Sequence, residues 1–239
     1  MDVVLYEKPL KIELVDGSLI VNGGRHPRSV RTLQQMKGVL MSRVDENANP
    51  DMYYMYRGVY AAEDVRFDIT VIPPRTIMGE CTKTFGHYHP GSEDGPAYPE
   101  VYQVLHGSAT FIMQKRNRNG SVDAIIVDAG EGDIVLLPPG FGHVSVNRGM
   151  GTLVLSNLVY ERFESMYGDY AENRGAAFYY LEGGEIVQNT NYIVQKTERL
   201  SPEGLNGRYG FSSKDLLSEF YENPKAFEFL KKPKARFKA

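Results

Sequence analysis

The sequence predicts an all-β protein, a jelly-roll β-barrel with short N-terminal strands, a short N-terminal helix and a C-terminal helical extension. Strand-like runs recur between turn signals from about residue 67 to residue 159, without helical patterns between them. The 24 Gly, 13 Pro, 16 Tyr and 11 Phe also favour strands and turns. The 239 residues suffice for one such domain with appendages. We expect N-terminal elements over 1–50, the barrel over 51–195 and the extension over 196–239.

The N-terminal part is expected to hold a hairpin and a helix that pack on the barrel. The runs Lys11–Val15 and Leu19–Val21 flank Asp16-Gly17, which is a hairpin-type turn signal. Ser29 is expected to cap a short helix that presents Leu33 and Met36 on one face.

The barrel part begins with the tyrosine-rich run Met52–Tyr60. This run predicts strand packing, with the alternative that one of its tyrosines reaches a ligand pocket. Near the end of the barrel, the strand-like run Glu185–Gln188 could add an edge. The other predicted strands are Phe67–Ile72, Thr76–Cys81, Val101–Leu105, Ala109–Gln114, Ala124–Val127, Asp133–Leu137, His143–Val146 and Leu153–Leu158.

The C-terminal extension is expected to contain one helix and a basic end. Ser212 or Ser213 could cap a helix over 216–221, and Pro224 would stop it. The end, Lys231–Lys238, is rich in lysine, which predicts a solvated tail, with contact to an acidic partner or a phosphate as the alternative.

Composition excludes several classes of function. A net charge of −3 argues against a nucleic-acid-binding surface. The lone Cys81 cannot form an internal disulfide. No stretch reaches the ~20 apolar residues that span a bilayer, and the N-terminal residues do not resemble a signal peptide. We therefore expect a cytoplasmic protein without nucleic-acid or membrane partners.

Three of the five histidines occur in a pattern typical of metal ligands. His87 and His89 are two residues apart, so on a strand their imidazoles project from the same face. With Glu100 and His143 they offer nitrogen and oxygen donors suited to a divalent transition metal, and affinity order alone does not select which metal. His26 and His106 lack such a context and are expected to be ordinary.

These residues fall into two spaced motifs that resemble those of the cupins, in which two histidines, a glutamate and a later histidine bind a metal inside a small β-barrel. The first motif contains His87, His89 and Glu100, and it departs from the cupin pattern because Cys81 replaces its leading glycine and the gap to the glutamate is long. The second motif matches at each position, namely Gly132, Pro138, Gly140, His143 and Asn147.

The long gap leaves a choice between two carboxylates. Glu93 has the usual short spacing from His89, but it lies in a loop-like stretch with two glycines and a proline. Glu100 starts an apolar run and precedes Gly107 by the interval of the motif. Because a ligand needs a rigid element to hold it, we favour Glu100.

The neighbourhood of the motifs looks like that of the cupin-type glucose-6-phosphate isomerases of archaea and some bacteria. The matching stretches, which cover roughly residues 50–175, are Asp68–Pro73, Thr84–His89, Glu100–Tyr102, Pro138-Pro139 with His143, and Tyr167-Gly168. The resemblance implies interconversion of glucose 6-phosphate and fructose 6-phosphate, as in glycolysis and gluconeogenesis. It also implies a homodimer and a divalent metal, most often Fe2+, with Mn2+, Ni2+, Co2+ or Zn2+ as alternatives.

The resemblance also implies roles for individual residues. Glu100 and Tyr102 would be catalytic, and Ser165 stands where the family has a histidine. The carboxylate would move a proton between C1 and C2 through a metal-stabilised enediol, with a hydride shift left open. The residues placed around the sugar phosphate are Thr70, Thr84, Gly86, Tyr160 and Tyr167.

Fold alone does not fix the activity, so two other functions stay open. One is an Fe(II) cupin dioxygenase, which needs two adjacent open metal positions and usually an apolar pocket. The other is a non-catalytic cupin that binds or senses sugars. The threonines and tyrosines near the motifs favour a polyol substrate over an apolar one.

Overall fold

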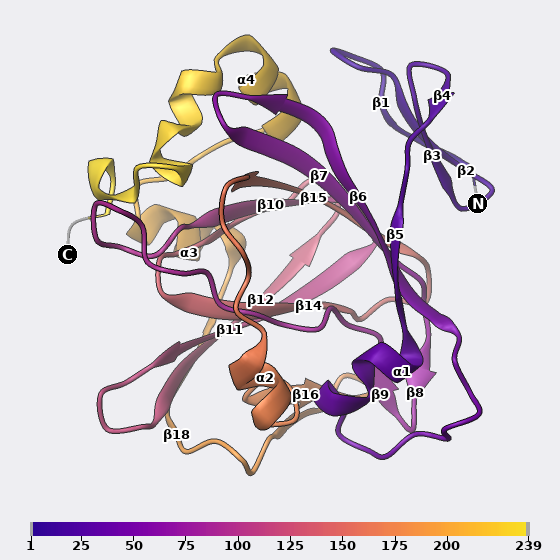
Figure 1. Ribbon diagram of the computed structural model, residues 1–239, viewed down its shortest axis with the longest axis vertical. Coiled ribbons are helices and arrows are strands. Elements are labelled where there is room, and N and C mark those ends of the chain that lie inside the picture. Colours follow the sequence, from indigo (N-terminus) through magenta and orange to yellow (C-terminus); the bar gives the residue numbers. More distant parts are fainter. Residues whose placement is uncertain (1, 238–239) are drawn as a thin grey trace.

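A computed structural model describes residues 2–237 and confirms the predicted all-β barrel (Figure 1). A six-stranded antiparallel sheet faces a four-stranded sheet, and buried side chains of both form the barrel core. In spatial order, the larger sheet consists of β13 (Ile134–Leu137), β10 (Glu100–His106), β15 (Leu153–Tyr160), β7 (Val65–Ile72), β6 (Asp51–Ala62) and β5 (Ser29–Thr32). The smaller consists of β14 (Phe141–Asn147), β11 (Ser108–Arg116), β12 (Val122–Gly130) and β18 (Val194–Leu200).

The larger sheet is buried on both faces, as β15 illustrates. Leu153 and Leu155 belong to the barrel core, whereas Val154 and Leu158 belong to a second core on the outer face of the sheet. This two-residue alternation follows from the pleat of a strand. It explains why β15 is apolar over most of its length rather than alternating with polar residues.

The N-terminal sheet and the C-terminal extension supply the outer core. A four-stranded sheet of β1 (Val3–Tyr6), β2 (Ile12–Val15), β3 (Ser18–Val21) and β4 (Gly24–Arg25) contributes Ile12 and Leu19. The extension contributes Phe220 and Phe227 from its helical part, drawn in yellow in Figure 1. Its elements are α3 (Pro202–Arg208), α4 (Leu216–Glu222), η2 (Pro224–Leu230) and η3 (Pro233–Ala235).

The basic end is packed rather than a solvated tail over its described part. Phe237 is buried, and its ring lies 5.7 Å from that of Tyr209 and 6.1 Å from that of Phe229. Lys231 pairs with Glu63 at the end of β6. Burial of the aromatic residue near these lysines holds the segment against the protein despite its positive charge. Lys238 lies outside the described residues.

Three local predictions are wrong in detail. Ser29 lies within β5 because this segment pairs with β6, and Thr32 instead begins α1 (Leu33–Met36) with a capping box. The cap of α4 is Asp215, whose carboxylate accepts from the Ser218 amide at 3.0 Å. The stretch 76–81 is a hairpin of β8 (Thr76–Ile77) and β9 (Glu80–Cys81), because Met78 and Gly79 take positive φ values.

The remaining elements surround the open end of the barrel or its edges. The predicted strand near Gln188 forms as β17 (Ile186–Gln188), but it pairs with β16 (Phe178–Tyr180) rather than extending the barrel. The expected division at residues 50 and 195 places β5 and most of β18 outside the barrel, although both pair with barrel strands. The short helices η1 (Lys37–Val39) and α2 (Gly168–Glu172) pack against each other. Among the described residues, no helix is long and apolar enough to cross a membrane.

Candidate metal centre and substrate pocket

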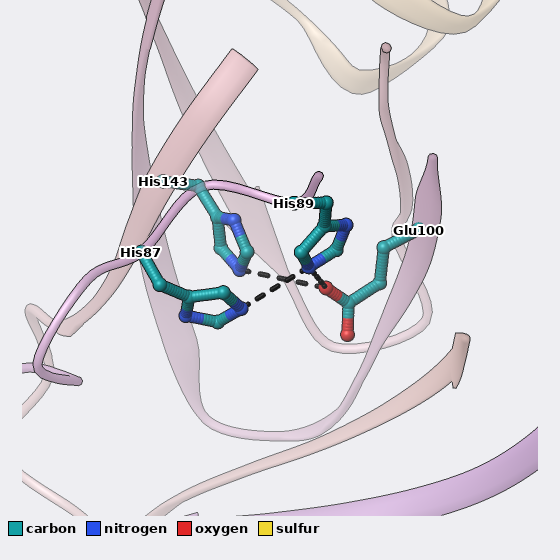
Figure 2. A group of neighbouring side chains, drawn as sticks. All are labelled: His87, His89, Glu100 and His143. Atoms are coloured by element: carbon teal, nitrogen blue, oxygen red, sulfur yellow. Dashed lines mark hydrogen bonds and ion pairs between the residues drawn. The ribbon is translucent and has the colours of Figure 1, made fainter. Parts of the chain in front are cut away.

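Four side chains predicted as metal ligands converge inside the barrel (Figure 2). Their donor atoms all lie within 4.8 Å of one another. Nε2 of His87 is 3.1 Å from Nε2 of His89, which in turn is 3.3 Å from Oε2 of Glu100. Nε2 of His143 is 3.6 Å from the same carboxylate oxygen. The cluster is therefore compact enough to hold one metal ion.

The two neighbouring histidines lie on an extended segment rather than on a regular strand, which corrects the prediction. Backbone hydrogen bonds of 3.3 and 3.1 Å join His87 to His143 on β14 in both directions. On the other side of the chain, the Tyr88 amide donates to the Met166 carbonyl at 3.0 Å. These isolated bridges keep the backbone extended, so His87 and His89 still project from one face.

Gly86 has a steric role just before the first histidine. Its φ of +88° and its surroundings both exclude a side chain. A Cβ atom there would lie 2.4 Å from the ring of Tyr170 and 2.6 Å from Val144. Glycine therefore lets the segment cross closely over β14, which brings His87 beside His143.

A backbone hydrogen bond selects the tautomer of His89. Its Nδ1 lies 2.8 Å from the carbonyl oxygen of Tyr98, and a carbonyl only accepts, so Nδ1 carries the hydrogen. In the neutral ring Nε2 therefore bears the lone pair, and this atom is the one that lies 3.3 Å from Oε2 of Glu100. Within the described chain, this buried oxygen has no hydrogen-bond donor. A cation placed among these donors would satisfy both, so the residues fit a metal ion.

Burial also favours the neutral form of two of the histidines. It lowers the pKa of His143 to about 4 and the pKa of His87 well below its usual range, with the other histidines adding to the effect at His87. The hydroxyl of Tyr102 lies 2.8 Å from Nε2 of His143. Burial and then the Glu100 charge raise the pKa of Tyr102 well above its usual value, so this hydroxyl keeps its proton.

The other candidate ligands lie elsewhere. Glu93 is exposed, on a turn within the stretch 91–97, and is not part of the cluster. His26 bonds the Arg57 carbonyl at 3.0 Å, and His106 pairs with Glu131 on the surface. The structure thus brings together the set favoured from the sequence and leaves the alternative carboxylate outside it.

The cluster opens into a pocket lined by most of the predicted substrate residues. Thr70, Thr84, Gly86, Tyr102 and Tyr167 all lie in its wall. The threonines and tyrosines among them offer hydroxyl groups on β7, on the extended segment, on β10 and next to α2. Such donors suit a ligand with many oxygens rather than an apolar one.

Tyr160 is not in this wall, which corrects its assignment. On β15, alternation turns Asn157 and Val159 into the pocket, so the next residue faces away. The Tyr160 ring instead lies 4.8 Å from that of Tyr98 and lines a separate cleft beside Lys231.

Several pocket residues did not follow from the motifs. The tyrosine-rich run was predicted to pack as a strand, with a pocket tyrosine as the alternative. It forms β6, and Tyr53 lines the pocket together with Met55 and Arg57. These three alternate along β6, so a two-residue period would have grouped them once one was placed. On β7, the same two-residue period groups Thr70 with Asp68 and Arg66. The further wall residues are Arg66, Asp68, Phe85, Asn157, Val159 and Ser165.

The barrel and the gathered histidine–glutamate set define a cupin, in agreement with the two motifs. Within this class, the family model described as Glucose-6-phosphate isomerase (GPI) matches residues 30–196. Because this match covers more than half of the chain, the protein belongs to the glucose-6-phosphate isomerase family.

Curated relatives agree with the family match. A glucose-6-phosphate isomerase of Thermococcus gammatolerans is 30% identical over 206 residues, covering 79% of this chain and 99% of the relative. That of Thermococcus litoralis is 27% identical over 197 residues, covering 78% and 96%. Among solved structures, an oxalate decarboxylase of Bacillus subtilis is 20% identical over 52% of this chain and 28% of that chain, with a TM-score of 0.33. That score carries no functional argument.

Proposed function

We propose that this protein is a metal-dependent aldose–ketose isomerase that interconverts glucose 6-phosphate and fructose 6-phosphate. The observation that carries the proposal is the convergence of His87, His89, Glu100 and His143 at the base of a hydroxyl-lined pocket. Membership of the glucose-6-phosphate isomerase family supports the substrate and the reaction. The oxygen-rich wall favours a sugar over the apolar substrates typical of cupin dioxygenases.

The four converging residues would hold the divalent metal. When bound, such an ion acts as a Lewis acid that stabilises negative charge on substrate oxygens. Three imidazoles and a carboxylate suit Fe2+, Mn2+, Co2+, Ni2+ and Zn2+ alike. The preference for Fe2+ and the homodimer rest on the family resemblance, the cytoplasmic location rests on the composition of the sequence, and all three stay predictions.

We assign the proton transfer to Glu100 and Tyr102. In the direction from aldose to ketose, the carboxylate of Glu100 takes the proton from C2, and the electron pair forms a double bond to C1. The carbonyl oxygen O1 gains a proton, which gives an enediol. O2 then loses its proton, and Glu100 returns its proton to C1.

Tyr102 would relay the proton between the two substrate oxygens. Its hydroxyl is protonated and lies beside His143, at the level of the cluster. It can donate to O1 and recover a proton from O2, so the step leaves the enzyme unchanged. Ser165 lines the pocket where the family has a histidine, and a serine hydroxyl does not titrate near neutral pH. The transfer therefore depends on Glu100 and Tyr102.

A coupled assay tests the activity. Purified protein is stripped with EDTA, reloaded with one metal at a time and given fructose 6-phosphate, with glucose-6-phosphate dehydrogenase and NADP as the reporter. We expect NADPH formation that EDTA abolishes and at least one metal restores. Absence of NADPH with every metal would refute the proposal. Oxygen consumption with a small diol would instead support the cupin dioxygenase. Tight binding of sugar phosphate without turnover would support the non-catalytic cupin that senses sugars.

Two histidine variants provide a matched control. His143→Ala should lose both bound metal and activity, because it removes one of the gathered donors. His106→Ala should retain both, because His106 lies at the surface beside Glu131. Equal effects of the two substitutions would contradict the assigned centre.

Solvent deuterium separates proton transfer from a hydride shift. If Glu100 carries the proton, exchange with D2O during the intermediate stage should place deuterium at C1 of the fructose 6-phosphate formed from glucose 6-phosphate. Proton NMR of the product would detect it. Repeated turnover without label would favour the hydride shift.

A further inference from the structure

Arginines form a positively charged part of the pocket wall. Arg57 on β6 and Arg66 on β7 line the wall, and Arg31 on β5 adjoins it. Nε of Arg66 is 2.8 Å from the carboxylate of Asp68, so its charge is compensated. Within residues 2–237, neither Arg31 nor Arg57 forms an ion pair with a carboxylate. Two guanidinium charges beside the pocket are thus available to an anionic ligand.

Arg31 is held among residues of the pocket wall. Its register partner on β6 is Tyr53, so both side chains project from the same face of the sheet. The Arg31 guanidinium lies 5.5 Å from the ring centre of Phe85 and 5.8 Å from that of Tyr167. Its Nε is buried and, among the described residues, has no hydrogen-bond partner. A buried N–H group without a partner calls for a ligand or another explanation.

A β-bulge in β6 sets the direction of the Arg57 side chain. The pairing of β6 with β7 shifts register between Tyr56 and Tyr60, and Gly58 within this stretch has a φ of +63°. The Gly58 amide donates to Oδ1 of Asp68 at 2.7 Å. A bulge of this kind redirects the side chains beside it. Asp68 thus fixes the backbone next to Arg57 with one oxygen while its other oxygen holds Arg66.

The two unpaired charges act on the same part of the pocket. Arg57 lines the pocket together with His87. The Arg31 guanidinium lies beside Tyr167, whose ring centre is 5.3 Å from that of His87. Both guanidinium groups are therefore close to the histidine side of the cavity, although they come from different strands.

We propose that Arg31 and Arg57 bind the phosphate group of the sugar substrate and make the site selective for phosphorylated sugars. A guanidinium forms charge-assisted hydrogen bonds with phosphate oxygens in a geometry that matches its planar fork. A phosphate dianion would compensate two positive charges and give the buried Nε of Arg31 a partner. This inference rests on the proposed sugar-phosphate isomerase activity and adds the residues that recognise the anion.

Charge-removing variants test the inference. We expect Arg31→Gln and Arg57→Gln each to raise KM for fructose 6-phosphate about tenfold or more, since a hydrogen bond to a charged group is commonly worth that much. Inhibition by inorganic phosphate should weaken by a similar factor. Metal content should not change, because neither residue belongs to the cluster.

Arg28→Gln is the matched control. Arg28 precedes β5, its guanidinium lies 4.4 Å from the ring centre of Tyr54, and it donates to the Gly17 carbonyl outside the pocket. The Arg28→Gln substitution removes one positive charge close to β5, as Arg31→Gln does, and should leave KM and phosphate inhibition unchanged. Equal increases in KM for all three variants would indicate only a general effect of charge and would overturn the inference.

Equilibrium binding separates this inference from the proposed function. Calorimetric titration of the metal-loaded protein with inorganic phosphate measures anion binding without turnover. If the wild-type protein binds phosphate but does not isomerise, the proposed function fails while the arginine variants still test recognition. If it isomerises and neither variant changes KM or phosphate binding, the arginine assignment is wrong and the isomerase stands.

Discussion

Asn157 holds one oxygen of the candidate metal carboxylate. Its Nδ2 donates a 2.7 Å hydrogen bond to Oε1 of Glu100, from the neighbouring strand of the larger sheet. The two side chains are 6% and 3% exposed, so water does not compete for this bond. With Oε1 occupied, Oε2 is the oxygen that faces the histidines. Asn157 thus positions the ligand without being one.

We therefore predict that Asn157→Leu weakens metal binding. The substitution leaves Oε1 of Glu100 buried without its donor, which frees the carboxylate to rotate or take a proton. Loss of such a supporting hydrogen bond typically costs about 10–100-fold in metal affinity. Competition against a metal-binding dye measures the affinity of each variant for Zn2+ or Co2+.

Asn206→Leu is the control for loss of a buried amide. Nδ2 of Asn206 donates to the Ile134 carbonyl at 2.7 Å, and its Oδ1 accepts from the Leu136 amide. We expect this variant to lower the free energy of unfolding while its metal affinity is retained. Equal metal affinity in Asn157→Leu and the wild type would contradict the positioning role.

A second prediction separates the two carboxylates that the sequence offered. Glu100→Ala should lose the metal, because it removes the only carboxylate in the described cluster. Glu93→Ala should retain it, because Glu93 is exposed on its turn. Elemental analysis after dialysis measures the metal content of both variants. Metal retained by Glu100→Ala and lost by Glu93→Ala would reverse the choice of ligand.

The sequence predicted the barrel and the metal ligands better than the pocket wall and the C-terminal end. Short β strands with glycine-containing turns identified the barrel, and the spacing of His87, His89 and His143 identified the residues that converge. These signals are local, because a strand period, the pair of His87 and His89, and the motif around His143 each lie within a short run of residues. The carboxylate choice also followed from local context, since Glu100 begins an apolar run that forms β10.

Contacts between distant segments could not be predicted from such patterns. The pocket wall combines Arg57 and Asn157 with residues near Thr84, and only the pairing of strands brings these together. Tyr160 was assigned to the wrong cleft because the sequence does not show where alternation on β15 begins. The packing of Phe237 was missed because the surrounding lysines dominated the composition of that segment.

The low histidine pKa values predict metal binding that resists acid. A ligand with an ordinary pKa of ~6.5 loses affinity as protons compete below that pH. Burial lowers the pKa of His143 to about 4 and also lowers that of His87, so both stay unprotonated in weak acid. Because protons compete less at these two ligands, we expect the affinity for Co2+ to fall less steeply between about pH 6.5 and about pH 5 than it would with three histidines of ordinary pKa. Visible absorption of the Co2+ form follows the titration, and a decline below pH 6.5 as steep as competition by three protons would give argues against this environment.

The C-terminal extension is predicted to stabilise the barrel from outside without taking part in the site. Phe220 on α4 is fully buried, and its ring lies 5.5 Å from Tyr60 of β6 and 5.7 Å from Phe227. Phe220→Ala should lower the free energy of unfolding by about 3–5 kcal/mol, because it leaves a cavity in the outer core. Urea unfolding at fixed metal concentration measures this change.

The neighbouring Glu222→Ala is the control, since Glu222 is exposed at the end of the same helix. Its effect should stay within about 0.5 kcal/mol. Both variants should keep the wild-type metal content and KM, because the outer core and the pocket lie on opposite faces of the larger sheet. If Phe220→Ala changed KM in fully folded protein, the extension would be coupled to the site through β6, the strand that carries both Tyr60 and Arg57.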